Sequence, residues 1–144
     1  MIVKRVAGAI GAELQAINLG DGIDAELAKT LRELLNEHEV LFLRDQSIEP
    51  ADQKALAEIF GPLQTHPAYH TVEGLPEVMI LESTKENPSK IEMWHSDMTF
   101  RQHPPSVTVL RGITIPEVGG DTLFASMTAA YAGLSEGMQR YLDG

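Results

Sequence analysis

The chain has 144 residues, of which 43% are hydrophobic and 22% charged, and its formal net charge is −10. A chain of this length is expected to form one domain with a substantial core. The acidic balance, with 11 scattered lysines and arginines, argues against nucleic acid as a partner, and no apolar run approaches the roughly 20 residues of a membrane span. Because there are no cysteines, any metal must be held by nitrogen and oxygen ligands. We expect a cytoplasmic protein that does not bind a membrane.

The first third of the chain predicts short strands, a helix and a further strand. Residues 3–18 alternate loosely between apolar and polar and contain two glycines, which favours short strands with turns. Asp24 is a candidate N-cap, and the leucines after it recur at helical spacing to about Glu37. Residues 40–43, with the sequence VLFL, are a continuous apolar run that predicts a strand buried on both faces.

The rest of the chain predicts a second helix, several short strands and a C-terminal helix. Pro50 suits the first turn of a helix, which Gly61 and Pro62 end, and Leu56 belongs to its inner face. Beyond it we expect a strand at 78–81, a polar loop at 84–91, strands at 93–100, 106–111 and 122–125, and a helix over 128–143. This order favours a mainly β fold with helical decoration, a double-stranded β-helix or jelly roll. Since such a fold needs about eight strands, we expect the sheet to be incomplete at the C-terminus.

One short motif, Trp94-His95-Ser96-Asp97, carries potential metal chemistry. On a strand, side chains at i and i+2 point to the same face, so the imidazole of His95 and the carboxylate of Asp97 can chelate one ion. A non-haem Fe(II) site usually consists of two histidines and one carboxylate with open positions. By itself the motif is a weak signal that is more often a hydrogen-bonded surface pair than a metal site, and histidine and aspartate also bind zinc.

Segments on both sides of this motif form a longer pattern. They are WHSDMTF at 94–100, PP at 104–105, GGDTLF at 119–124, GAEL at 11–14, VLFLRDQ at 40–46, FGPL at 60–63 and HPAY at 66–69. In order and spacing, over essentially all 144 residues, this pattern resembles the taurine dioxygenase/TfdA family of Fe(II)- and 2-oxoglutarate-dependent dioxygenases. The resemblance implies that residues 1–144 are the N-terminal part of a single jelly-roll catalytic domain.

The resemblance assigns roles to individual residues. His95 and Asp97 match the first two iron ligands of the family, whereas the distal histidine ligand and the arginine that binds 2-oxoglutarate match positions beyond 144. Thr122 matches the residue whose hydroxyl binds 2-oxoglutarate, although it is also an ordinary β-branched strand residue. His66 and Tyr69 match positions that hold the anionic head of the substrate in taurine-cleaving members.

The substrate pocket departs from the family pattern at one position. Taurine-cleaving members carry an asparagine that contacts the substrate three residues before the tryptophan of the motif, and this chain has Ile91 there. An apolar contact in place of a polar one favours a substrate more hydrophobic than taurine, such as an alkyl sulfate, an alkyl sulfonate or an aryloxy acid. We expect the aromatic residues Trp94 and Phe100 to pack in the core.

The resemblance implies an oxidoreductase that hydroxylates a small anionic organic substrate with O2, Fe(2+) as cofactor and 2-oxoglutarate as co-substrate. Decarboxylation of 2-oxoglutarate to succinate and CO2 is coupled to the hydroxylation. Retention of Asp97 argues against a halogenase, in which that ligand position is open. Two alternatives remain open: a metal-binding jelly-roll protein that is not an oxygenase, and an inactive truncated fragment of a dioxygenase. The resemblance is also compatible with a homo-oligomer.

Overall fold

The computed structural model describes residues 1–89, 91 and 93–144. The contacts divide the chain into two compact units, which we describe separately. The first unit comprises residues 1–17, 29–46 and 114–144, and the second comprises residues 18–28 and 47–113. None of the helices within the described residues has the length and apolar character needed to cross a membrane.

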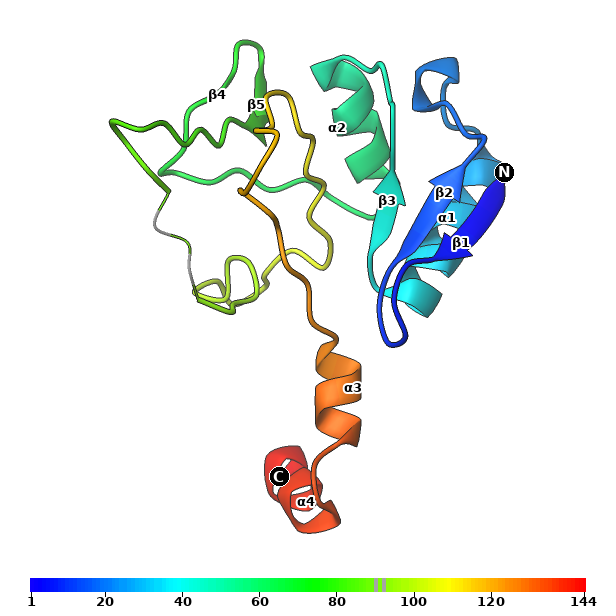
Figure 1. Ribbon diagram of the computed structural model, residues 1–144, viewed down its shortest axis with the longest axis vertical. Helices are drawn as coiled ribbons and strands as arrows, with labels where there is room; N and C mark the ends of the chain where they lie inside the picture. Colours follow the sequence, from blue (N-terminus) through cyan, green and yellow to red (C-terminus); the bar gives the residue numbers. More distant parts are fainter. Residues whose placement is uncertain (90, 92) are drawn as a thin grey trace. The chain divides into compact units, whose positions relative to one another are not determined.

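The first unit contains a three-stranded sheet with the order β1-β2-β3 (Figure 1). Its strands are β1 (Ile2–Arg5), β2 (Ala12–Gln15) and β3 (Leu41–Leu43). β1 is antiparallel to β2, whereas β2 and β3 are parallel, so the connection between them must cross over. Most of that crossover is helix α1 (Ala25–His38), which appears behind the sheet in Figure 1. The strands and turns expected within residues 3–18 are therefore confirmed.

The turn between β1 and β2 depends on one glycine. Gly11 has a φ of +93°, and a Cβ built on it would lie 2.7 Å from Cγ2 of Val6. Its carbonyl accepts a hydrogen bond from the Val6 N–H at 3.1 Å, and its own N–H donates to the carbonyl of His38 at 2.8 Å. Glycine is thus required both for the backbone conformation and for the close approach of Val6.

Two expectations for α1 and β3 have different outcomes. Asp24 accepts a hydrogen bond from the Leu27 N–H at 2.8 Å, which confirms it as the N-cap of α1. The expectation that β3 is buried on both faces is wrong, because its residues are only half-buried. Within the described residues β3 is at the edge of the sheet. The fully buried residues belong instead to the central strand β2, where Ala12 and Leu14 are 0% and 2% exposed. On α1, Leu31 is 1% exposed.

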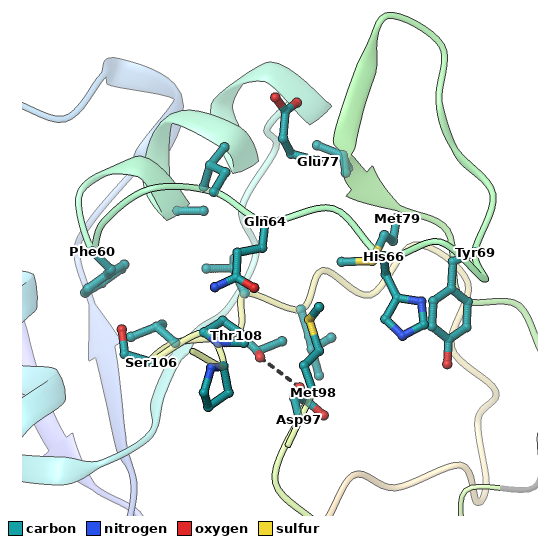
Figure 2. Close-up of a pocket in the computed structure, with 18 of the residues that line it drawn as sticks. Phe60, Gln64, His66, Tyr69, Glu77, Met79, Asp97, Met98, Ser106 and Thr108 are labelled. Atoms are coloured by element: carbon teal, nitrogen blue, oxygen red, sulfur yellow. Dashed lines mark hydrogen bonds between the residues drawn. The ribbon is translucent and has the colours of Figure 1, made fainter. Parts of the chain in front are cut away.

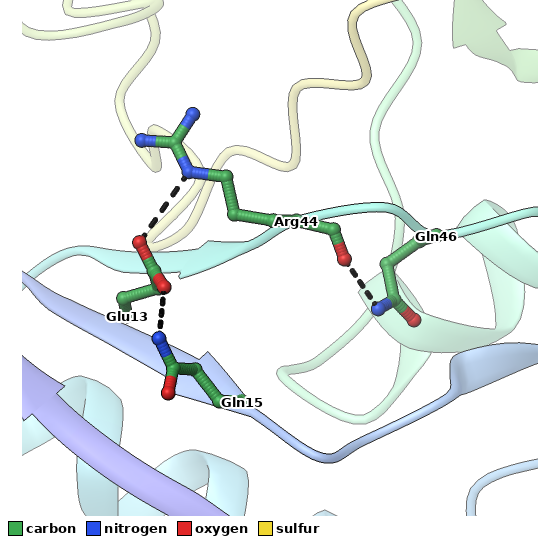
Figure 3. Close-up of polar contacts among 4 residues, drawn as sticks. All are labelled: Glu13, Gln15, Arg44 and Gln46. Atoms are coloured by element: carbon green, nitrogen blue, oxygen red, sulfur yellow. Dashed lines mark hydrogen bonds and ion pairs between the residues drawn. The ribbon is translucent and has the colours of Figure 1, made fainter.

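Four polar residues of β2 and of the segment after β3 contact one another (Figure 3). Gln15 donates to the carboxylate of Glu13 at 2.6 Å, and Nε of Arg44 lies 3.5 Å from the other oxygen of that carboxylate. Gln46 in turn donates to the carbonyl of Arg44 at 2.8 Å. The hydrogen bond from Gln15, followed by the contact with Arg44, lowers the pKa of Glu13 from its ordinary value of 4.5. These contacts link the two parallel strands through side chains.

The second unit is built around helix α2 (Pro50–Glu58) and a hairpin of β4 (Thr71–Val72) and β5 (Leu75–Met79). Proline occupies the first turn of α2 as expected, and Asp52 accepts a hydrogen bond from the N–H of Glu49 at 2.8 Å. α2 contacts β5 and the short 3-10 helix η1 (Leu19–Asp21). Leu56 of α2 and Val78 of β5 are both buried. The strand expected at 78–81 therefore exists but begins earlier and ends at Met79.

The expected strands at 93–100, 106–111 and 122–125 are wrong for the described residues, which form no ladder there. An extended segment becomes a strand only when a neighbour takes up its backbone hydrogen bonds. These segments find no such neighbour in the described part of the chain, and their apolar side chains stay exposed, as at Leu110 (58%) and Leu123 (71%). The part that is described consists of two small sheets with helices.

The C-terminal helix expected over residues 128–143 is two helices, α3 (Met127–Ala132) and α4 (Glu136–Asp143). Ser126 caps α3 by accepting a hydrogen bond from the Ala129 N–H at 2.9 Å. Ser135 caps α4 by accepting one from the Met138 N–H at 3.3 Å. Gly133 lies between the two helices, where glycine favours termination and the following serine favours a new start.

Candidate active site

His95 lies in an irregular segment of the second unit and Asp97 begins the turn that follows it. Neither residue is on a strand, so the alternation argument for their proximity is wrong. The two side chains nevertheless meet: Nε2 of His95 is 3.3 Å from Oδ1 of Asp97. Their side chains are 51% and 47% exposed. The irregular segment before the turn of residues 97–100 therefore brings the two candidate ligands together.

Each side chain of the pair uses its other polar atom in a separate contact. Nδ1 of His95 lies 2.9 Å from the carbonyl of Met93, which can only accept, so the ring proton is on Nδ1. Thr108 donates its hydroxyl to Oδ2 of Asp97 at 2.8 Å (Figure 2). Nε2 and Oδ1 are left facing each other. When the histidine is neutral both atoms present lone pairs, so a cation shared between them stabilises the pair.

This donor set fits a metal ion. Two ligand atoms that are each about 2.1 Å from an ion and about 90° apart lie about 3.0 Å from each other, close to the observed 3.3 Å. A histidine that ligates through one nitrogen usually donates its other N–H to a carbonyl or carboxylate, as His95 does to Met93. Within the described residues, no group of three or more histidine, aspartate or glutamate side chains completes a metal site.

The backbone directly after Asp97 adopts an uncommon conformation. Met98 has a φ of +53°, and its carbonyl accepts a hydrogen bond from the N–H of Arg101 at 3.0 Å. The left-handed region costs a residue other than glycine about 1–2 kcal/mol. The contacts of the turn must offset this cost, and the turn reverses the chain just beyond the candidate ligands.

A cavity of about 760 Å³ opens beside the pair, entirely within the second unit. This volume lies in the range of about 300–1,000 Å³ that is typical of small-molecule sites. α2, β5, Ile91 and the loops at 60–69, 93–98 and 103–110 contribute its walls. Most of the wall is apolar, with the polar side chains of His66, Tyr69 and Asp97 among the lining residues (Figure 2). His95 also lines the cavity.

His66 and Tyr69 lie side by side in this cavity, with ring centroids 4.7 Å apart (Figure 2). Nδ1 of His66 accepts a hydrogen bond from the N–H of Ala68 at 3.1 Å, so the proton of the neutral ring is on Nε2. Phe100 packs edge-on against His66 at 5.7 Å. The half-buried ring therefore retains one N–H donor with which it can bind an anionic or polar group.

Lys54 also lines the cavity, but its charge is already paired. Its Nζ donates to Oε1 of Glu58 at 3.0 Å, and this hydrogen bond raises the pKa of Lys54, with a smaller contribution from the charge of Glu77. A lysine held by one carboxylate and near another is a poor binding group for an anion. His66 is thus the better donor for an anionic ligand.

The apolar and aromatic residues near the pair lie at the surface of the unit. Ile91 and Trp94 line the cavity and are 61% and 69% exposed. Phe100 is 70% exposed. The expectation that Trp94 and Phe100 pack in the core is wrong, because both side chains are at the surface of the unit.

Comparison with known proteins decides the family. The family model described as "Taurine catabolism dioxygenase TauD, TfdA family" matches residues 3–144. The chain belongs to this family.

The relatives are similar over nearly the whole of this chain. The alkylsulfatase of Acinetobacter baylyi is 34% identical over 98% of this chain and 44% of the relative. The alpha-ketoglutarate-dependent sulfate ester dioxygenase of Pseudomonas putida is 32% identical over 98% of this chain and 46% of the relative. A crystal structure of a taurine dioxygenase from Burkholderia xenovorans has a TM-score of 0.84 and 33% identity, over 99% of this chain and 51% of that one. The chain thus spans about half the length of these TauD/TfdA proteins.

Thr122 belongs to the first unit, whereas the other candidate residues of this TauD/TfdA chain belong to the second. Its side chain is exposed, and two glycines precede it. Gly119 and Gly120 have φ values of +79° and +73°, and a Cβ on Gly120 would lie 3.2 Å from Cγ of Pro116. The chain therefore bends before Thr122 with a backbone conformation that favours glycine at both positions.

Sequence reasoning missed a set of contacts made by Arg101. Its guanidinium donates to Oε1 of Gln64 at 3.1 Å and to the carbonyl of Thr65 at 2.6 Å. Gln64 in turn donates to the carbonyl of His103 at 3.2 Å. We call Arg101 and Gln64 the loop clamp, because they join the loop that carries His66 to the turn that follows Asp97. The pairing spans 37 positions of the sequence, and no local pattern indicates it.

Proposed function

We propose that the chain forms part of an Fe(II)- and 2-oxoglutarate-dependent dioxygenase that hydroxylates a small anionic organic substrate. The observation that carries this proposal is the pair of Nε2 of His95 and Oδ1 of Asp97, 3.3 Å apart and beside a cavity of about 760 Å³. Membership of the TauD/TfdA family supports it. We further propose that residues 1–144 contribute to one jelly-roll catalytic domain in which both units take part.

In this proposal His95 and Asp97 hold the iron through Nε2 and Oδ1, and the hydroxyl of Thr122 donates to 2-oxoglutarate. The iron and its co-substrate supply the oxidising chemistry when bound: O2 and 2-oxoglutarate yield succinate and CO2 as a substrate C–H becomes C–OH. The protein contributes orientation and shielding. The carbonyl of Met93 fixes the proton of His95 on Nδ1, so Nε2 stays free as a ligand.

The cavity supports an anionic substrate with an apolar body. The Nε2–H of His66 is the donor for the anionic head, with Tyr69 beside it. Ile91 replaces a polar contact by an apolar one in the same cavity. The names of the relatives from Acinetobacter baylyi and Pseudomonas putida, an alkylsulfatase and a sulfate ester dioxygenase, support an alkyl sulfate within the wider class of sulfates, sulfonates and aryloxy acids. A hydroxyl placed on the carbon that bears a sulfate ester leads to release of sulfate and an aldehyde.

The test is formation of succinate from 2-oxoglutarate with a panel that contains an alkyl sulfate, an alkyl sulfonate, an aryloxyacetate and taurine. We expect succinate with at least one of the first three substrates and its loss in His95→Ala. His70→Ala, a histidine outside the described cavity lining, is the matched control and is expected to match the wild type. A second measurement is the visible charge-transfer band that anaerobic Fe(II) and 2-oxoglutarate give together. Absence of both succinate and the band, or a His95→Ala variant equal to the wild type, contradicts the proposal.

A further inference from the structure

Residues 106–111, after the double proline, form an extended segment in the second unit whose exposure alternates. Val107 and Val109 are half-buried, whereas Thr108 between them is exposed. The side-chain amide of Gln53, on α2, donates to the carbonyl of Val109 at 3.2 Å. The segment is thus anchored to a helix one residue away from Thr108, and the position of the Thr108 side chain does not depend on its own contacts alone.

The two oxygens of the Asp97 carboxylate make different contacts, one with the hydroxyl of Thr108 and one with His95. Thr108 donates to Oδ2 at 2.8 Å (Figure 2). Oδ1 lies 3.3 Å from Nε2 of His95. The terminal torsion of an aspartate is broad, so a carboxylate without a partner samples many orientations. A hydrogen bond to one oxygen selects the orientation in which the other oxygen faces the histidine.

We propose that Thr108 is a positioning residue that orients Asp97 for metal binding, an inference that rests on the proposed function. A neutral hydroxyl suits this task, because it donates one hydrogen bond and leaves the negative charge of the carboxylate available to a cation. A lysine or arginine in its place would compete with the metal for the same charge. Thr108 and the Met93 carbonyl thereby have equivalent roles. Thr108 binds Oδ2 of Asp97 and the carbonyl binds Nδ1 of His95, and in each ligand the other polar atom is left for the metal.

The contact is not expected to stabilise the fold. Asp97 is 47% exposed and Thr108 is exposed, so water competes for both groups and replaces the hydrogen bond when it is lost. A metal site responds differently, because loss of a hydrogen-bond partner behind a ligand typically weakens metal binding about 10- to 100-fold. The positioning role therefore predicts a variant that folds as the wild type does but binds metal less tightly.

The experiment measures Mn(II) affinity from the loss of the free-ion electron paramagnetic resonance signal, together with the thermal unfolding midpoint. Mn(II) takes the place of iron so that oxidation does not interfere. We expect Thr108→Val to weaken Mn(II) binding about 10- to 100-fold with an unchanged midpoint, and Thr108→Ser to restore it. Thr99→Val is the matched control, since Thr99 lies in the turn after Asp97 and makes no side-chain hydrogen bond within the described residues.

The outcomes separate this inference from the proposed function. If His95→Ala loses Mn(II) binding while Thr108→Val binds as the wild type does, the positioning role is wrong and the metal centre stands. If His95→Ala binds Mn(II) as tightly as the wild type, the metal centre itself is wrong. Equal weakening by Thr108→Val and Thr99→Val also overturns the positioning role. Should Thr108→Val fail to fold, Thr108→Ala replaces it, with weak binding expected in Ala and wild-type binding in Ser.

Discussion

Replacing Arg101 by methionine tests whether the loop clamp serves substrate binding. The variant keeps much of the length and apolar stem of the side chain but loses both donors, to Oε1 of Gln64 at 3.1 Å and to the carbonyl of Thr65 at 2.6 Å. His66 follows Thr65 directly, so the loss releases the loop that presents its Nε2–H to the cavity. We expect the loop to sample several positions in the free protein and to order only when substrate binds.

The magnitude follows from the two hydrogen bonds. A hydrogen bond to a charged group contributes about 1.5–3 kcal/mol when it is shielded from water. The contact with Gln64 is part-buried and that with Thr65 is exposed, so we take about 1.5 kcal/mol for the two together after screening. Substrate binding must supply this free energy in the variant. Since about 1.4 kcal/mol corresponds to a factor of ten, KM for the substrate should rise about tenfold.

Steady-state kinetics with the best substrate of the panel give KM and kcat, and a Mn(II) titration gives the metal affinity. We expect a higher KM, a nearly unchanged kcat at saturation and wild-type metal affinity, because Arg101 touches neither His95 nor Asp97. Arg111→Met is the matched control, an arginine outside the described cavity lining, and should behave as the wild type. An unchanged KM in Arg101→Met, or a loss of metal affinity as large as the change in KM, refutes the role given to the clamp.

Two further predictions concern the fold of the first unit. Leu31→Ala, at a side chain that is 1% exposed, should lower the free energy of unfolding by about 2–5 kcal/mol in urea titrations, whereas Leu142→Ala at a 58% exposed position should change it little. Gln15 and Arg44 lower the pKa of Glu13 in the folded state, so their stabilising effect is present above the ordinary value of 4.5 and is lost as the pH falls through the lowered pKa. The stability difference between wild type and Glu13→Gln should therefore shrink on acidification below that value, and a difference that stays constant with pH contradicts this.

The elements that the sequence predicted correctly are those whose signals are local. Asp24 begins α1 because its carboxylate reaches an N–H three residues away, and Pro50 begins α2 because its ring fits the first turn. Ser135 and Gly133 carry equally local signals, yet the C-terminal segment was predicted as one helix. The spacing of its apolar residues suited a continuous helix, and that pattern outweighed the cap and the glycine.

The strands that failed are those whose partners the described chain does not provide. β1, β2 and β3 form because each has a neighbour in the first unit. Residues 106–111 and 122–125 have the same alternating or apolar character but form no ladder in the described part. The alternation of apolar and polar residues indicates which face of a segment would be buried. It does not indicate whether a neighbouring strand exists. The proposed jelly roll requires such neighbours for these segments.

The candidate site shows the same division between local and non-local information. The sequence predicted the proximity of His95 and Asp97 from strand geometry, and the structure instead produces it in an irregular segment that ends at the turn of residues 97–100. Two residues that are two positions apart can meet either on one face of a strand or in irregular backbone, so the spacing alone did not distinguish the two. Thr108 and Arg101 were not predicted, because their partners lie 11 and 36 or 37 positions away and threonine and arginine are common surface residues.

These contacts assign different tasks to different parts of the second unit. Thr108 acts on the oxygen of Asp97 that faces away from His95, and Arg101 acts on the loop that carries His66. The contacts of Thr108 and those of Arg101 share no residue within the described chain. In a Thr108→Val/Arg101→Met double variant, the free-energy change in metal binding and that in KM should each equal the sum of the changes in the two single variants. An interaction between the two changes would show that the segment from residue 97 to 101 transmits the loss of one contact to the other. The turn in that segment carries Asp97, the partner of Thr108, and is followed directly by Arg101, and the left-handed Met98 lies between them.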